Sequence, residues 1–277
     1  TNGGDELLRL ILTTFAGEND TLAITSPSYS LYPVLANIQG CSLTEIPLDK
    51  DLNYPNELAE LLVNSSAKIC FLVNPHAPTG GLLPVKFIDK LASNFKGVLV
   101  VDEAYSDFVD PALRYDCIPL INKHKNLLLL RTLSKGYSLA GLRFGYGLGD
   151  SELISPIKYK TRDSYNTDYI SQKLACAALS SREYAMSTWE KIRKSRKSLS
   201  TKLEQLGLKS WPSQTNFILV QMPDDPGAEY VYKKLKIDNI LVRHFDVDNL
   251  NDKIRITIGS ESENKRLISS LINILKV

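Results

Sequence analysis

The residues best suited to chemistry lie in one short segment, Arg131 to Arg143. The segment follows four consecutive leucines, Leu127–Leu130, and contains a Ser-Lys pair at Ser134 and Lys135. The apolar run predicts a buried strand that delivers the lysine to a polar loop. A lysine amine forms Schiff bases with carbonyl compounds, and it does so best when it is desolvated beside a second cation. Taken alone, the segment fits a solvated surface lysine equally well, so the case rests on other segments.

Three further segments place useful groups at the ends of predicted elements. Gly3-Gly4 precede a helix, and free N–H groups at a helix N-terminus bind anions, although Asp5 could simply cap that helix. Tyr29 follows a short strand, where it could stack on a flat ligand or belong to the core. Asp102 ends an apolar strand, at the edge where α/β sheets bind ligands, although it could also cap the next turn.

A proline-rich loop and two arginines complete the candidates. The loop 74–80, Asn-Pro-His-Ala-Pro-Thr-Gly, follows the apolar run 68–73 and is expected to be rigid. Arg243 and Arg255 come from two predicted strands, and Arg255 lies opposite the apolar face of its strand. The two arginines could clamp one anion with paired hydrogen bonds, although exposed arginines are more often surface charges.

The elements that must position these groups predict an α/β fold. Continuous apolar runs at 68–73, 97–102 and 126–131 indicate parallel strands that are covered on both faces. Intervening helical patterns complete the βαβ units; they lie at 5–15, 29–39 and 84–94. After Gly149 the pattern changes to helices at 171–179, 184–206, 228–235 and 264–275, with strands at 216–221, 240–243 and 253–258. We therefore expect a large domain over residues 1–165 and a smaller α+β domain over residues 166–277.

The composition excludes several classes of protein. The 277 residues are 43% hydrophobic, which is enough for a substantial core, and the net charge of +2 favours neither nucleic acid nor a membrane surface. No apolar run is long enough to span a bilayer, and the chain start lacks the features of a signal peptide. A cytoplasmic protein fits these features. The histidines are too dispersed to suggest a metal site, and buried free thiols are predicted at Cys70 and Cys176.

In chain order, these segments resemble the class I/II aminotransferases of fold-type I, which use pyridoxal 5′-phosphate (PLP). The matching motifs run from end to end: NGGDE, SPSYSLY, NPHAPTG, VDEAY, RTLSKGYSLAGLRFGY, DSYNTD, QTNFILV, ILVR and IRITIGS. The Ser-Lys segment and VDEAY are specific to the superfamily, and the lysine segment with ILVR and IRITIGS points to the branch that acts on histidinol phosphate. The resemblance implies amino transfer between histidinol phosphate and 2-oxoglutarate in histidine biosynthesis, by a homodimer.

The resemblance also implies a role for each candidate. Lys135 forms the Schiff base and carries the proton, Asp102 pairs with the pyridine nitrogen and Tyr105 with the ring hydroxyl, and Tyr29 stacks on the ring. The cofactor phosphate is held by Gly4, Asp5, Ser134 and Arg143. Asn74 belongs to the cofactor site, and Asn166 and Asn216 lie near the pocket. Arg243 and Arg255 hold the phosphate or carboxylate of the substrate.

Two departures from the family pattern leave alternatives open. Ala77 stands where the family commonly has an asparagine that contacts the ring oxygen, so Tyr105 acts alone or with help from His76 or a neighbouring asparagine. The chain also begins where the family's phosphate loop begins, which suggests a missing N-terminal segment. The alternatives are an aromatic or other amino-acid aminotransferase, a phosphothreonine-type decarboxylase, and a non-catalytic PLP-fold binding module.

Overall fold

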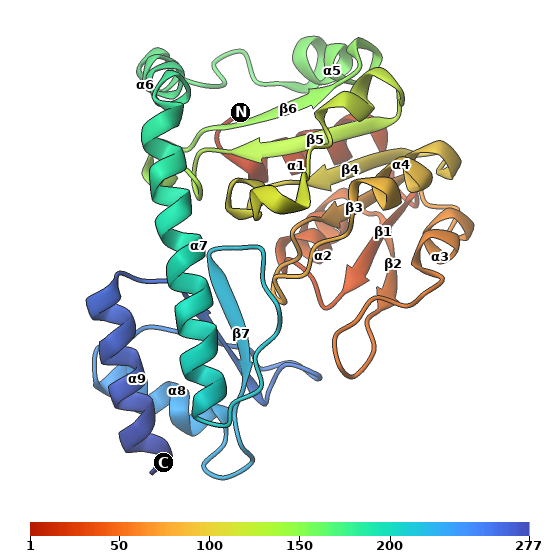
Figure 1. Cartoon of the computed structure of the whole chain (residues 1–277). Coiled ribbons are helices and arrows are strands. Elements are labelled where there is room, and N and C mark those ends of the chain that lie inside the picture. The colour runs from red at the N-terminus through yellow and green to blue at the C-terminus, as the bar shows by residue number, and fades with distance from the viewer. Residues whose placement is uncertain (277) are drawn as a thin grey trace.

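The computed structural model describes residues 1–276, which form two sheets with helices packed against them (Figure 1). The larger sheet contains β1 (Thr21–Ser26), β2 (Ser42–Pro47), β3 (Ile69–Val73), β4 (Val98–Asp102), β5 (Leu127–Thr132) and β6 (Gly145–Gly149). Its strand order is β2-β1-β3-β4-β5-β6, and every pair is parallel except β5 with β6. The predicted, mostly parallel central sheet is therefore confirmed.

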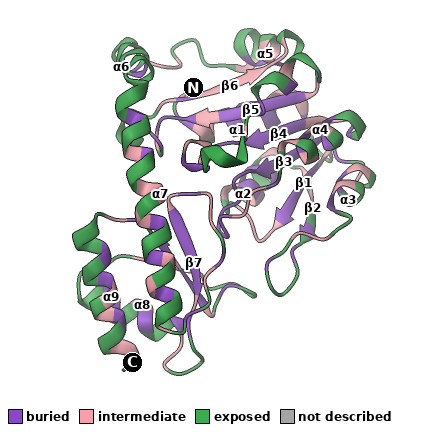
Figure 2. Cartoon of the chain, viewed as in Figure 1, coloured by how far each residue is buried: buried purple, intermediate pink, exposed green. Residues whose placement is uncertain are grey.

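Helices cover both faces of this sheet. One core layer joins the sheet to α1 (Gly4–Phe15) and α2 (Leu31–Gln39), and the other joins it to α3 (Leu58–Asn64) and α4 (Val85–Asn94). Because both faces are covered, β3 is buried along its whole length, and Figure 2 shows the central strands as buried. This rigid sheet ends in the loops that carry the candidate site.

The smaller sheet has the order β7-β9-β8 and is antiparallel. Its elements are β7 (Phe217–Gln221), β8 (Arg243–His244) and β9 (Lys253–Thr257), packed with α8 (Ala228–Ile237) and α9 (Glu261–Leu275). In β9, Ile254 and Ile256 are buried while Arg255 lies on the other face, as the alternating pattern predicts. The expected α+β character of this region is confirmed.

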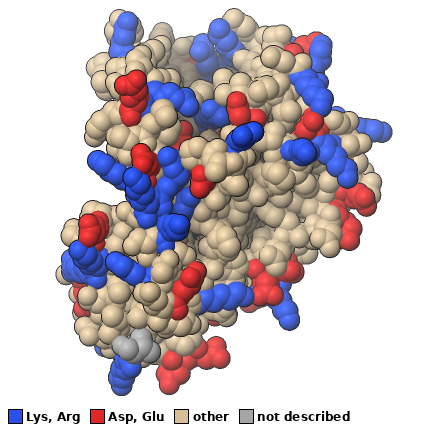
Figure 3. All heavy atoms as spheres, in the orientation of Figure 1, with Lys and Arg blue, Asp and Glu red and all other residues tan. Residues whose placement is uncertain are grey.

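Three helices connect the two sheets: α5 (Ser151–Pro156), α6 (Tyr169–Ser180) and α7 (Arg182–Gln205). Figure 1 shows α7 running alongside both sheets, from α6 down to α9. Lys and Arg side chains gather over its middle in Figure 3. Lys191, Lys194 and Lys197 of this helix are exposed. The domain boundary at residue 165 stays a prediction.

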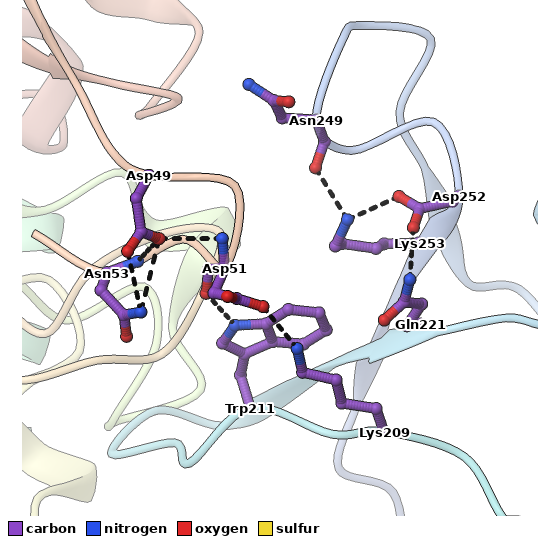
Figure 4. A network of polar contacts seen from close by, with 9 residues as sticks. All are labelled: Asp49, Asp51, Asn53, Lys209, Trp211, Gln221, Asn249, Asp252 and Lys253. Carbon is purple, nitrogen blue, oxygen red and sulfur yellow. Dashed lines mark hydrogen bonds and ion pairs between the residues drawn. The ribbon is translucent and has the colours of Figure 1, made fainter.

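A polar network also joins the two sheets on the side of residues 49–53 (Figure 4). The indole N–H of Trp211 donates to the backbone oxygen of Asp51 over 2.7 Å, and Lys209 pairs with the Asp51 carboxylate at 2.8 Å. Trp211 also packs with Leu48, Leu52 and other apolar side chains. These contacts fix the smaller sheet relative to the larger one.

The structure corrects four details of the sequence prediction. The strand β2 and the helix α3 were not predicted, because β2 is an edge strand with a mostly polar pattern and α3 is only seven residues long. The strand predicted over 240–243 is reduced to Arg243–His244, because Ile240 and Val242 pack against the core without joining the ladder. Cys70 is buried as predicted, but Cys176 is exposed on α6, so that prediction was wrong.

Candidate active site

Most of the predicted site residues line one cavity of about 230 Å³ at the C-terminal ends of the parallel strands. These residues are Gly4, Asp5, Tyr29, Asp102, Tyr105, Ser134, Lys135, Arg143 and Arg255. They come from α1, from the last residue of β4, from the segments after β1, β4 and β5, and from β9 of the smaller sheet. The topology gathers them because parallel strands end at the same edge of the sheet.

One end of the cavity can hold a dianionic group. Helix α1 begins at Gly4, and no side chain caps its first N–H groups. Gly3 has a φ of 82°, and a side chain there would collide with the guanidinium of Arg143, so glycine lets this arginine lie against the helix start. The Ser134 hydroxyl lies 2.9 Å from that of Thr132, and it also lines the cavity. Uncapped N–H groups, an arginine and a hydroxyl together suit a phosphate.

Asp102 lies deep in the cavity and is held from two directions. Its Oδ2 accepts a hydrogen bond from the Tyr32 hydroxyl at 2.9 Å, and its Oδ1 accepts one from the Ala104 N–H at 3.0 Å. Burial raises the pKa of Asp102 from 3.8 to about 6, against the effect of these hydrogen bonds. The carboxylate therefore ionises near neutral pH at a place where a cationic partner would stabilise it.

Asp102→Asn is expected to stabilise the cofactor-free protein above pH 6. Because the folded pKa lies above the unfolded one, this group contributes its stability below pH 3.8 and loses it as the pH rises through about 6. Two pKa units correspond to at most about 3 kcal/mol. Urea unfolding at pH 4 and pH 8 should show little difference between variant and wild type at pH 4 and a gain for the variant at pH 8. Equal stability at both pH values would contradict a buried carboxyl with a raised pKa.

Lys135 lies beside two cations and an aromatic ring. Its Nζ is 5.8 Å from the centre of the Tyr105 ring. Desolvation lowers the pKa of Lys135, and the charges of Arg255 and Arg143 lower it further, whereas Asp5 opposes them. The lysine is open to solvent at the cavity, so a carbonyl compound can reach it. A cation-crowded amine of this kind is the activated nucleophile that the sequence predicts.

Arg255 brings the smaller sheet to the cavity. Its guanidinium lies over the Phe217 ring, 4.7 Å from the ring centre, and the same ring packs edge-on against Tyr105 at 5.1 Å. Arg243 is the cross-strand partner of Arg255, but it does not line the cavity. Arg255 is therefore positioned for a ligand in this cavity. Of the two arginines predicted to clamp one anion, only Arg255 lines the cavity.

The loop after β3 contributes less than predicted. The Asn74 amide bonds the backbone N–H and oxygen of Leu83, at 2.8 and 3.0 Å, and does not line the cavity. The buried ring of His76 has its Nδ1 2.8 Å from the Thr79 hydroxyl, and burial lowers its pKa to about 4. Only Ala77 of this loop reaches the cavity. Of the candidates for a ring-oxygen contact, Tyr105 is the one that lines the cavity.

Two predicted asparagines lie elsewhere. Asn166 bonds the Glu6 carboxylate at 2.7 Å and borders a separate hollow near the chain start. Asn216 accepts the Ile258 N–H through its backbone oxygen and does not line the cavity. The structure therefore does not bring either residue into the cavity.

Sequence reasoning missed two aromatic residues, Tyr32 and Phe217. Tyr32 is fully buried, bonds Asp102 and packs edge-on against Tyr29 with ring centres 5.5 Å apart. Its spacing of three residues from Tyr29 puts both near one face of the α2 start, and that spacing was the available signal. Phe217 supports both Tyr105 and Arg255, and no local pattern distinguishes it from a core residue.

The family model for aminotransferase class I and II matches residues 1–271. The chain belongs to this family. It is 38% identical to histidinol-phosphate aminotransferase 1 of Trichormus variabilis over 275 residues, covering 99% of this chain and 76% of that relative. It is 40% identical to the histidinol-phosphate aminotransferase of Geotalea uraniireducens over 271 residues, covering 98% and 75%.

Solved structures of other proteins share this fold. The histidinol-phosphate aminotransferase of Sinorhizobium meliloti, in complex with PLP, superimposes with a TM-score of 0.89 at 26% identity, covering 99% of this chain and 76% of that one. The L-threonine-O-3-phosphate decarboxylase of Porphyromonas gingivalis reaches a TM-score of 0.84 at 22% identity, covering 100% and 83%, which shows a shared fold alone.

Class I and II aminotransferases depend on PLP, and the cavity of this family member fits that cofactor. The uncapped start of α1 with Arg143 and Ser134 suits the phosphate, and the buried Asp102 suits a protonated pyridine nitrogen. Within residues 1–276, no three His, Cys, Asp or Glu side chains are grouped to bind a metal. In the same residues, no helix has the length and apolarity needed to cross a membrane.

Proposed function

We propose that this aminotransferase transfers an amino group between histidinol phosphate and 2-oxoglutarate, in histidine biosynthesis. The observation that carries the proposal is the identity of 35–40% to curated histidinol-phosphate aminotransferases over nearly the whole chain. The decarboxylase on the same scaffold is less similar in sequence, at 22%. The lining of the cavity also includes Arg255, which comes from the smaller sheet.

Bound PLP supplies an electron sink for the negative charge that develops at the α-carbon of the substrate. In the proposed mechanism, Lys135 would hold the cofactor through its Nζ, and the same amine would move the proton at the substrate α-carbon. Its lowered pKa keeps more of the amine neutral, as a base requires. Asp102 would hold a proton on the pyridine nitrogen, and Tyr105 would donate to the ring oxygen. Tyr29 would pack against the ring.

Separate groups bind the anion of the cofactor and the anion of the substrate. Gly4, Asp5, Ser134 and Arg143 hold the cofactor phosphate, mainly through backbone N–H groups and the guanidinium. Arg255 binds the phosphate or carboxylate of the substrate, since its planar fork can form two parallel hydrogen bonds to either group. This arginine can therefore serve both half-reactions.

Steady-state kinetics with histidinol phosphate, phenylalanine and O-phosphothreonine as donors test the substrate assignment. We expect kcat/KM for histidinol phosphate to exceed that for phenylalanine by at least about 100-fold, which is roughly 2.7 kcal/mol of differential transition-state binding. Equal values, or a larger value for phenylalanine, would identify an amino-acid aminotransferase. Release of carbon dioxide from O-phosphothreonine would identify a decarboxylase.

We further propose that the enzyme is a cytoplasmic homodimer. Helix α6 exposes Tyr169, Ile170, Leu174 and Leu179, and Figure 2 shows most of this helix as exposed. Large apolar side chains that one chain leaves exposed can be covered by a second copy of the chain. Sedimentation of a monomer at micromolar concentration would contradict the dimer.

A further inference from the structure

The backbone next to Lys135 is held between two structural elements. Gly136 is buried, and a side chain there would collide with the carboxylate of Asp107, which lies in the short helix 106–108 after β4. Glycine therefore lets the chain after Lys135 lie directly against this helix. The carbonyl oxygen of Gly136 needs a hydrogen-bond partner, because a buried carbonyl without one lowers the stability of the fold.

Trp189 on α7 supplies that partner. Its indole Nε1 donates to the Gly136 oxygen over 2.6 Å, and the side chain is 6% exposed. The Tyr137 ring packs edge-on against the indole, with ring centres 5.5 Å apart and an interplanar angle of 84°. Trp189 therefore contacts the residues directly after Lys135 by a polar bond and by packing.

Helix α7 is itself fixed close to this point. The buried Arg196 donates to the backbone oxygens of Phe108 at 3.1 Å and Thr215 at 2.6 Å. Phe108 also shares an apolar cluster with Trp189. The helix is thus tied to the segment after β4 and to the segment before β7, so the indole is a firm support and not a mobile surface group.

We propose that Trp189 is a positioning residue for Lys135, acting through the Gly136 carbonyl. The lysine side chain has four rotatable bonds, so the place of its Nζ above Tyr105 depends on a fixed backbone. A displacement of about 1 Å at a reacting group can cost up to about 100-fold in rate. The inference rests on the proposed role of Lys135 and adds a residue 54 positions later in the chain.

The two tryptophans of the chain allow a matched experiment. Trp189→Phe keeps an aromatic ring and removes the N–H donor, whereas Trp211→Phe makes the same change at the Asp51 oxygen, in the network of Figure 4. Both indoles are buried, at 6% and 8% exposure, and both donate to a backbone oxygen. Melting temperatures of both variants measure any general loss of stability.

The readouts are the rate at which cofactor-free protein turns yellow with PLP, and kcat and KM. For Trp189→Phe we expect colour formation and kcat to fall by about tenfold, with KM changed less than twofold. Trp211→Phe should form the coloured complex at the wild-type rate. If Trp189→Phe loses melting temperature but keeps both rates, the tryptophan is only structural and the proposal is wrong.

A second measurement follows the tryptophan signals of the wild-type protein by nuclear magnetic resonance. With ¹⁵N-labelled tryptophan, the protein gives two indole N–H signals, and Trp211→Phe assigns them. Adding PLP should move the Trp189 signal by more than the Trp211 signal, because a cofactor held by Lys135 would change the surroundings of the Gly136 carbonyl to which Trp189 donates. An unmoved Trp189 signal would overturn the proposal. Lys135→Ala separates the two hypotheses: if that variant still forms the coloured complex, the role of Lys135 fails, whatever Trp189 does.

Discussion

Replacing Lys135 by alanine is expected to abolish the imine absorbance of the PLP-loaded protein and to lower turnover by at least about 10⁴-fold. General acid–base catalysis by one group contributes roughly 10²–10⁴-fold, and the loss of the bond between lysine and cofactor adds to it. The cavity contains no other lysine among its described lining residues, so no second amine there can take over. Absorbance spectra of the loaded protein and single-turnover kinetics measure both effects.

The matched control is Lys125→Ala. Lys125 precedes β5 and Lys135 follows it, so the two lysines lie near opposite ends of the same strand. Lys125 is exposed and pairs with Glu152 at 2.6 Å, and removing an exposed ion pair of this kind changes stability little. Both the colour and the turnover of this variant should match wild type. A coloured, active Lys135→Ala protein would disprove the proposed mechanism.

The sequence places Lys135 and Asp102 at strand ends, and the structure brings both to one cavity for a physical reason. Lys135 and Asp102 follow continuous apolar runs, and such runs identify buried parallel strands whose ends meet at one edge. The chemistry of each group then follows from its residue type. Arg255 could be placed on the correct face because the alternation of β9 identifies the side away from the core.

Residues that act through tertiary contacts could not be predicted in this way. The amphipathic pattern of α7 predicts a helix, but it does not say that Trp189 reaches the Gly136 carbonyl 53 residues earlier. Asn74 matched a family motif, yet its amide bonds Leu83 instead of facing the cavity. Cys176 lies in a small-residue helix that would normally be buried, but α6 leaves that side chain exposed. Local patterns contain no information about these partners.

The second large effect is expected from Asp102→Asn, which should lower turnover by roughly 10²–10³-fold, the range seen when one electrostatic stabiliser is removed. Asparagine keeps the shape of the side chain, but it has no charge to hold a proton on the pyridine nitrogen. The wild-type carboxylate can do this at pH 7–8 because its pKa, even raised by burial, is about 6, and a cationic partner lowers it again. The ¹⁵N chemical shift of labelled PLP in the two proteins measures the ring proton directly.

Glu103→Gln is the control for this prediction. Glu103 is the next residue, is also buried, and pairs with Arg131 at 2.8 Å, but it does not line the cavity. Removing its charge leaves Arg131 without its partner, so we expect a lower melting temperature with the ring proton retained. Asp102→Asn should do the reverse: it should lose the ring proton and turnover while the cofactor-free protein gains stability at pH 8. The Asp102 carboxylate lowers stability at pH 8, yet hydrogen bonds from Tyr32 and Ala104 hold it in place, as expected for a charge that has a functional role. Wild-type turnover by Asp102→Asn would contradict that role.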